Sequence, residues 1–296
     1  MKKTVKQRVR LAVFGLCTVL AAAFAAPPVQ AAVPTASTYT FGDEIIDSEY
    51  CILINAAQGT IAARKNEKAR MNPASMTKIM TVLAAADHVR SLDDRVTITQ
   101  DIIDHAAATG CTRVGYEAGD RPSVRDLFYG TILPSGADAA IALGRYCAGS
   151  DEAFVAMMNQ KAASLGMLST HFENCVGLYD ENHYSTAEDM AVLLLNAATN
   201  PLCLQVLSAR NTKVGGSASL PGGISLTNLF LTRIDGLSLP GKVYSAKTGY
   251  VSAAGYCAAS FYISSAGVPF ICVTGKADSS MNAVFDHTML YACFAQ

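Results

Sequence analysis

The sequence predicts an α+β fold: one antiparallel β-sheet, flanked by helices, with an inserted, mostly helical subdomain. Segments with the pattern of β-strands occur near both ends of the chain, at 50–65 and at 242–274, whereas helical patterns fill the region between them. With 51% hydrophobic and 16% charged residues over 296 positions, the chain can also bury a sizeable core. A sheet assembled from the two ends accommodates both patterns in one layered domain.

The first 31 residues resemble a secretory signal peptide in their composition. Five cations lie within residues 2–10, an apolar run covers 11–26, and Val29-Gln30-Ala31 provides a small-residue cleavage site. The run has about 16 residues, which is short for a membrane span. We therefore expect cleavage after residue 31 and an exported chain, on the extracellular or envelope side of the cytoplasmic membrane, with no stable span after cleavage. An uncleaved N-terminal anchor is the alternative.

The charge, the cysteines and the histidines limit which partners, disulfides and metal sites the sequence predicts. The sequence carries 23 Lys+Arg against 24 Asp+Glu, and removal of the basic leader makes the remainder acidic. A broadly basic nucleic-acid-binding protein is thereby excluded. Eight widely spaced cysteines follow the leader and leave disulfides and free buried thiols equally open. His171, Cys175 and His183 are close in sequence but match no zinc pattern, so we expect no metal.

The N-terminal elements begin after an extended lead-in, expected at 32–48. Residues 50–55 form an apolar run, and the turn at Gln58-Gly59 predicts a hairpin with 60–65. Asn72-Pro73 has the pattern of a helix N-cap followed by proline at the first helical position, and apolar residues then follow at helical spacing. A short strand is predicted at Arg95–Thr99.

The remaining elements follow from capping signals and periodicity. Ser123-x-x-Asp126 is a capping box that predicts a helix to Leu133, where Pro134 ends it. Helices are predicted at 137–147, 151–165, 186–198 and 282–294, strands at 242–249, 254–263 and 268–274, and an irregular loop at 209–243.

The helix after residue 73 carries the first candidate for chemistry, Ser75-Met76-Thr77-Lys78. Residues three apart on a helix share one face, so Lys78 can contact Ser75. A serine hydroxyl is a weak nucleophile unless a base takes its proton, and burial can make lysine that base. The pattern also occurs by chance, as an ordinary first-turn serine followed by a solvated lysine.

Two further motifs gain meaning beside the first. Lys247-Thr248-Gly249 ends a predicted strand and can hold a carboxylate, although a charged strand with a bulge is the alternative. Ser135-Gly136-Ala137 follows a helix break, where a hydroxyl can relay a proton; Ser135-x-x-Asp138 is equally the pattern of a capping box.

Together, with 60 and then 112 residues between them, the three motifs resemble those of the DD-peptidase/β-lactamase superfamily. The closer resemblance is to the serine-type D-alanyl-D-alanine carboxypeptidases, the low-molecular-mass penicillin-binding proteins of peptidase family S11. It covers about residues 50–293. Supporting stretches are Gly119-Asp120, Leu165-Gly166-Met167, Phe172-x-Asn174, Gly177-Leu178, His183-Tyr184-Ser185-Thr186-Ala187, Thr227-Asn228 and Tyr250.

The resemblance implies a serine carboxypeptidase that needs no cofactor. Ser75 would attack the penultimate D-Ala of a peptidoglycan stem peptide ending in D-Ala-D-Ala, and Lys78 would be the base. Ser135 would pass a proton to the leaving D-Ala, and Lys247 would hold the terminal carboxylate together with Thr248. The backbone N–H groups of Ser75 and Tyr250 would form the oxyanion hole. Gly136, Ala137 and Gly249 would line the substrate, and β-lactams would inhibit.

The resemblance also implies one catalytic domain at 49–296, without the C-terminal β-domain or membrane anchor of many relatives. The main departure is Ala137, where the family usually has asparagine. An asparagine placed there should raise turnover if the site keeps the family's shape, and should clash if other groups fill the space. Two other functions stay open: a β-lactamase, although the Glu-x-x-Leu-Asn string of class A enzymes is absent, and a catalytically weak wall-binding or β-lactam-sensing protein.

Overall fold

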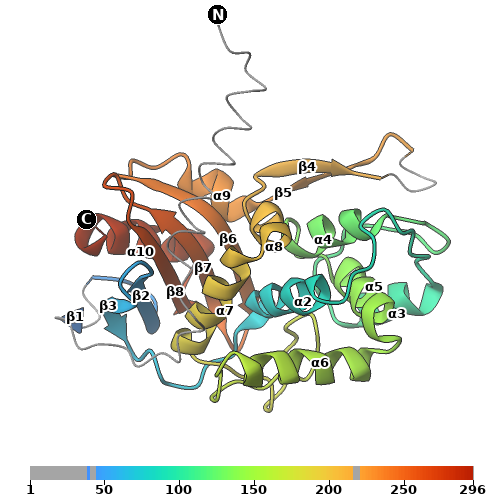
Figure 1. The fold of residues 1–296 in the computed structure, drawn as a ribbon, viewed down its shortest axis with the longest axis horizontal. Coiled ribbons are helices and arrows are strands. Elements are labelled where there is room, and N and C mark those ends of the chain that lie inside the picture. Colours follow the sequence, from blue (N-terminus) through green and yellow to red (C-terminus); the bar gives the residue numbers. More distant parts are fainter. Residues whose placement is uncertain (1–38, 41–44, 216–220, 296) are drawn as a thin grey trace, which may run out of the picture.

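A computed structural model describes residues 39–40, 45–215 and 221–295 of the chain. Figure 1 shows a sheet on one side of the molecule and a group of helices on the other, with α7 (Ala187–Thr199) and α8 (Pro201–Leu207) between them. This is the predicted α+β arrangement. The expected leader at 1–31 and most of the expected lead-in lie outside the described residues.

The larger sheet has six strands in the order β1-β3-β2-β8-β7-β6. Strand β2 pairs with β8 in antiparallel register, with Leu53 opposite Cys272, so the two ends of the chain form one sheet as predicted. Only β1 runs parallel to its neighbour. The strands are β1 (Tyr39–Thr40), β2 (Tyr50–Asn55), β3 (Thr60–Lys65), β6 (Lys242–Val251), β7 (Gly255–Ile263) and β8 (Pro269–Ala277).

Helices cover both faces of this sheet. On one face α10 (Ser280–Phe294) packs against β7 and β8, and α9 (Leu229–Ile234) packs against β6. On the other face α7 (Ala187–Thr199) packs against β2, β7 and β8. Because each face is covered, the inner strands β2, β7 and β8 contain runs of buried residues, whereas burial alternates along β3.

The inserted helices surround α2 (Thr77–Ala86), whose residues from Thr77 to Ala85 are all buried. The predicted capping box at the start of α4 is present, since Ser123 Oγ accepts the Asp126 N–H at 3.1 Å. The other helices of this group are α3 (Gln100–Ala108), α4 (Val124–Ile132), α5 (Ala137–Ala148), α6 (Asp151–Ser164) and α8 (Pro201–Leu207).

Some predicted elements were wrong. Residues 95–99 form no strand, since Arg95 makes only an isolated bridge to Ser123. The region 209–243 is not an irregular loop, because β4 (Asn211–Val214) and β5 (Ile224–Thr227) form a hairpin that α9 follows. Helix α3 was missed because only Ile102 and Ala106 are buried, which leaves little periodicity to detect.

The state of the cysteines and the length of the helices bear on two further predictions. All eight cysteines in the described part of the chain are free, and five of them are buried, which resolves the open alternative in favour of thiols. Within the same residues no single helix is both long and apolar enough to cross a bilayer.

Candidate active site

Ser75 lies in a short 3-10 turn, η1 (Ala74–Met76), that leads into α2. The helix therefore begins later than predicted, and Asn72 caps the turn instead, since its Oδ1 accepts the Ala74 N–H at 2.8 Å. Ala74 has φ of +46°, which turns the chain sharply before the serine. The half-buried Ser75 hydroxyl is thus presented at the start of a fully buried helix.

Lys78, which the first motif predicts to be the base, lies next to Ser75. Its Nζ lies 3.0 Å from Ser75 Oγ and donates to the Val176 carbonyl oxygen at 2.6 Å. The side chain is fully buried, and burial lowers the pKa of Lys78 to about 8. At pH 7 about one molecule in ten then carries the neutral amine, several hundred times the fraction of an ordinary lysine. The geometry and the pKa both suit proton removal from Ser75.

Ser135 occupies the bend between α4 and α5 and has φ of +64°, a strained conformation for a residue with a side chain. Its Oγ accepts a hydrogen bond from Lys247 Nζ at 3.0 Å. The alternative capping box is not formed, because the Asp138 carboxylate accepts the N–H groups of Val114 and Gly115 instead. Gly136 is required at this bend, since a Cβ there would lie 2.6 Å from Val114.

Lys247 comes from β6 and is as buried as Lys78. Its Nζ also donates to the Thr248 carbonyl oxygen at 2.7 Å. Burial, and then the charge of Lys78, lower the pKa of Lys247 well below its usual value. A bound carboxylate would raise that pKa again, so Lys247 is suited to binding an anion and holding a proton only when the anion is present.

Strand β6 brings the third motif against the nucleophile. A Cβ at Gly249 would lie 2.9 Å from both the Ser75 nitrogen and the Pro73 oxygen, so only glycine allows this approach. Strand β6 also ends the sheet order, which leaves one side of its backbone without a strand partner. Tyr250 follows, and its half-exposed ring lies against that of Tyr256, with 4.4 Å between the centroids and a tilt of 31°.

Ala137 is fully buried within the apolar core of the inserted helices. Its N–H donates to the Thr112 carbonyl oxygen at 2.8 Å, which fastens the loop before α4 to the start of α5. The methyl group therefore has no contact with solvent in the structure.

The loop at 174–178 positions Lys78, a role that sequence reasoning missed. Asn174 Oδ1 accepts the N–H groups of three following residues and folds the loop tightly, so that the Val176 carbonyl faces Lys78. Thr81 Oγ1 adds a bond to the Cys175 carbonyl oxygen at 2.6 Å. Phe172-x-Asn174 and Gly177-Leu178 are among the stretches that support the family resemblance, but their residue types do not indicate that a backbone oxygen of this loop holds Lys78.

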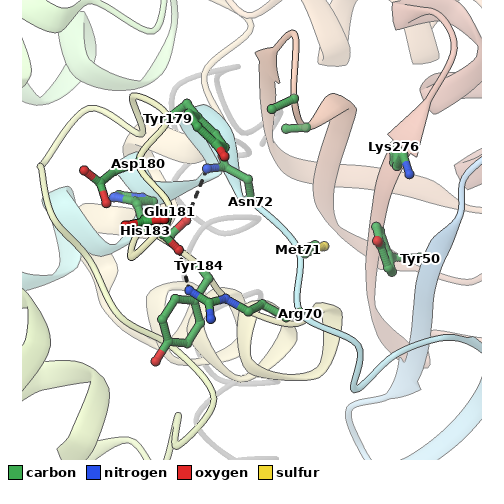
Figure 2. Close-up of a pocket in the computed structure, with 12 residues that line it drawn as sticks. Tyr50, Arg70, Met71, Asn72, Tyr179, Asp180, Glu181, His183, Tyr184 and Lys276 are labelled. Carbon is green, nitrogen blue, oxygen red and sulfur yellow. Dashed lines mark hydrogen bonds between the residues drawn. The ribbon is translucent and has the colours of Figure 1, made fainter.

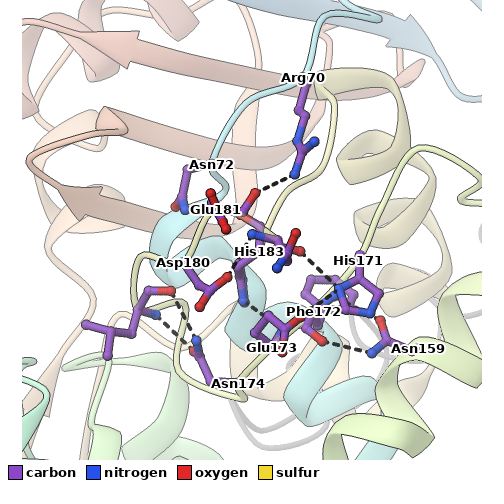
Figure 3. Close-up of polar contacts among 12 residues, drawn as sticks. Arg70, Asn72, Asn159, His171, Phe172, Glu173, Asn174, Asp180, Glu181 and His183 are labelled. Atoms are coloured by element: carbon purple, nitrogen blue, oxygen red, sulfur yellow. Dashed lines mark hydrogen bonds and ion pairs between the residues drawn. The ribbon is translucent and has the colours of Figure 1, made fainter.

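His183 links the start of this loop to α2, and Figure 3 shows its contact with Glu173. The Glu173 N–H donates to His183 Nδ1 at 3.1 Å, so Nε2 carries the proton and donates to Thr77 Oγ1 at 2.8 Å. Burial lowers the pKa of His183 to about 4, which keeps the ring neutral. The ring is a structural link between the loop and α2. Within the described residues no group of three or more His, Cys, Asp or Glu could hold a metal ion.

Known proteins resemble the chain in sequence. The peptidase S11 model, described as D-alanyl-D-alanine carboxypeptidase, matches residues 36–278. D-alanyl-D-alanine carboxypeptidase DacF of Bacillus subtilis (strain 168) is 36% identical over 147 residues, which are 50% of this chain and 38% of the relative. The D-alanyl-D-alanine carboxypeptidase of Streptomyces sp. (strain K15) is 31% identical over 211 residues, 69% and 72% of the two chains. The chain thus spans less than half the length of the first relatives.

Solved structures agree with the sequence comparisons. The Streptomyces K15 DD-transpeptidase superposes with a TM-score of 0.76 at 25% identity, over 88% of this chain and 97% of that one. The D-alanyl-D-alanine carboxypeptidase from Mycobacterium tuberculosis H37Rv gives a TM-score of 0.75 at 25% identity, over 88% and 94%. The chain therefore belongs to the peptidase S11 family of D-alanyl-D-alanine carboxypeptidases.

Proposed function

We propose that the protein is an exported serine D,D-carboxypeptidase that removes the terminal D-Ala from peptidoglycan stem peptides through an acyl-enzyme at Ser75. One observation carries the proposal: two hydroxyl–lysine pairs, Ser75 with Lys78 and Ser135 with Lys247, come together from three distant segments. Gly249, two residues from Lys247 on β6, lies against the Ser75 backbone nitrogen, so both pairs belong to one site. Nucleophile, base, relay and anion-binding group are all supplied by this set.

The reaction follows from these contacts. Neutral Lys78 takes the proton of Ser75 as Oγ bonds to the carbonyl carbon of the penultimate D-Ala. The N–H groups of Ser75 and Tyr250 stabilise the oxyanion. The peptide C–N bond then breaks, and the proton held by Lys78 passes through Ser135, which is bonded to Lys247, to the departing amine, so that Lys78 is neutral again. Water next attacks the ester carbonyl and gives a proton to Lys78, which passes it to Ser75 Oγ as the ester C–O bond breaks.

The same groups account for inhibition by β-lactams. Lys247 and Thr248 would hold the substrate's terminal carboxylate, and penicillins carry a carboxylate at a comparable distance from a strained amide. Attack by Ser75 opens that ring, and because the leaving nitrogen stays tethered, the acyl-enzyme persists. Penicillin should therefore label the protein covalently.

A second candidate differs only in the acceptor of the acyl group. One structural neighbour is named a DD-transpeptidase, and a peptide amine in place of water would turn hydrolysis into transfer. The proposed signal peptide at 1–31 would direct the proposed catalytic domain at 49–296, and with it either reaction, to the outside of the cytoplasmic membrane. An intact mass beginning at Ala32 would support that export.

The experiment measures D-Ala release from diacyl-L-Lys-D-Ala-D-Ala by the purified protein, with and without an added amine acceptor. We expect release by hydrolysis, covalent labelling by penicillin at Ser75, and neither in Ser75→Ala. Rapid turnover of penicillin with no D-Ala release would favour a β-lactamase. Labelling without D-Ala release would favour a sensing protein, and full labelling of Ser75→Ala would remove the nucleophile assignment.

A further inference from the structure

A cavity of about 310 Å³ lies where the chain leading to Ser75 passes between a loop and the edge of the large sheet (Figure 2). Segments 70–72, 179–184 and 253–254 line it, together with Tyr50 and Lys276. None of the proposed catalytic side chains lines this cavity, so the cavity is separate from the reacting groups. No step of the proposed reaction uses it.

The cavity lies on the path that a substrate takes away from the reacting bond, an argument that rests on the proposed function. The terminal carboxylate is held at Lys247, and the reacting carbonyl lies at the N–H of Tyr250. These two points set the direction of the peptide along β6, toward higher residue numbers. The strand ends at Val251, and the turn that follows carries the cavity wall at 253–254.

The opposite wall is equally close to the nucleophile. Asn72 lines the cavity and precedes Ser75 by three residues, which span at most about 11 Å in an extended chain. The residue before D-Ala-D-Ala in the substrate is therefore within reach of the cavity through its side chain.

Charged groups line the cavity without neutralising one another. The Arg70 guanidinium lies 3.5 Å from the centre of the Tyr184 ring and donates to the Glu181 backbone oxygen, as Figure 2 shows. Within the described residues neither the Asp180 nor the Glu181 carboxylate takes part in an ion pair. Lys276, by contrast, is paired with Glu49 at 2.5 Å. One guanidinium and two carboxylates are thus left for a ligand.

The loop that carries these carboxylates is fixed to the catalytic helix. Asn72 Nδ2 donates to the His183 backbone oxygen at 3.1 Å, and the His183 ring is bonded to Thr77. Asp180 Oδ1 accepts the Asn182 N–H at 2.7 Å, which shapes the turn. The backbone of the loop that carries these carboxylates is therefore fixed relative to the helix that follows Ser75, as a specificity subsite requires.

We propose that this cavity binds the side chain of the diamino acid that precedes D-Ala-D-Ala, in its free zwitterionic form. The side-chain ammonium lies against Asp180 and Glu181, and the side-chain carboxylate accepts from Arg70. Because acylation of that amine removes its charge and adds bulk, the enzyme prefers stem peptides that are not cross-linked through it.

The test uses three peptides ending in D-Ala-D-Ala, with diaminopimelate, its side-chain N-acetyl derivative or lysine before the alanines. D-Ala release is measured for wild type, Arg70→Gln and Asp180→Asn/Glu181→Gln, each normalised to that variant's own penicillin acylation rate. Asparagine keeps the acceptor for Asn182, so the turn is retained. Glu152→Gln, an exposed carboxylate on α6 away from the cavity, is the matched control.

We expect wild type and the control to prefer the free diaminopimelyl peptide over the acetylated one by at least tenfold in kcat/KM. The double variant loses that preference, and Arg70→Gln loses activity on the diaminopimelyl peptide but not on the lysyl one. Equal wild-type rates on free and acetylated peptides would overturn the subsite while leaving the carboxypeptidase in place. A preference that survives the double variant would also overturn it. Absence of both D-Ala release and penicillin acylation would overturn the proposed function itself.

Discussion

At the scale of single residues, two buried lysines carry opposite tasks. Lys78 must lose its proton to act on Ser75, whereas Lys247 must hold one to bind a carboxylate. Burial lowers the pKa of both side chains. What separates their roles is the ligand: a substrate carboxylate raises the pKa of Lys247, which it contacts, whereas the lowered pKa of Lys78 lets that lysine give up its proton.

This arrangement predicts how acylation depends on pH. The protonated form of Lys78 cannot accept a proton, and its pKa is about 8. The rate of penicillin acylation should therefore fall about tenfold per unit as pH decreases below 8 and level off above it. Stopped-flow acylation between pH 6 and 9.5 measures this.

The control for that profile is Lys78→Arg, whose guanidinium stays protonated throughout the range. We expect its acylation to be slower by about two to four orders of magnitude, the usual contribution of a positioned base. A flat wild-type profile, or rapid acylation by the arginine variant, would exclude Lys78 as the base.

Position 137 gives a second prediction at this scale. Because the Ala137 methyl is fully buried in the apolar core, the structure favours the clash over the gain in turnover. Ala137→Asn would bury a carboxamide at a cost of about 1–3 kcal/mol if it finds no partner. We expect a lower unfolding temperature and slower D-Ala release. An increase in turnover would mean that the side chain reaches the substrate.

At the scale of elements, the loop at 174–178 sets the position of Lys78. Gly177 has φ of +81°, and a Cβ there would lie 1.9 Å from the Ala74 carbonyl oxygen. Gly166 has φ of +78° with no atom within 4 Å of such a Cβ. The two glycines share a left-handed backbone conformation, which would strain any other residue, but only a Cβ at Gly177 would collide with a neighbouring atom.

Substitution of each glycine separates these effects. Gly166→Ala should cost about 1–2 kcal/mol for the left-handed backbone alone and leave penicillin acylation unchanged. Gly177→Ala should lower stability further and slow acylation at least tenfold, because the loop moves away from Lys78. Thermal unfolding and acylation rates measure both, and identical behaviour of the two variants would show that the loop is not held by this contact.

The same elements show where sequence reasoning succeeds. Ser123 and Asp126 form a capping box whose partners are three residues apart, so the sequence alone predicts the start of α4. The β4–β5 hairpin has only four residues in each strand, and so short an apolar pattern resembles that of a loop. Local signals are visible in a sequence, whereas pairing that depends on the rest of the fold is not.

The candidate active site likewise combines side chains that the sequence predicts with a backbone atom that it does not. The three motifs identified Ser75, Lys78, Ser135 and Lys247, because spacing and residue type carry their chemistry. The Val176 carbonyl that holds Lys78 is a backbone atom, which any residue would supply. No residue type signals such a role, so only the structure could reveal it.

At the scale of the whole molecule, the free thiols give a further prediction. Burial raises the pKa of Cys175 and Cys203 to about 12, which suppresses the reactive thiolate. Among the described cysteines the exposed Cys293 should react fastest with a thiol reagent in the native protein, and a reductant should not change the unfolding temperature. A mass two units lower before reduction than after it would reveal a disulfide and contradict this.

The pairing of β2 with β8 also has a consequence for how the protein is made. Leu53 and its partner Cys272 are separated by most of the chain. At about 5–20 residues per second, a ribosome needs roughly 10–40 s to synthesise the segment between them. Throughout that interval β2 is an apolar strand without its central partner, and Gly249 has not yet arrived against Ser75. We therefore expect the nascent chain to acquire the Ser75 site only after its last strands emerge, so that a precursor exported as proposed would have no assembled active site to unfold.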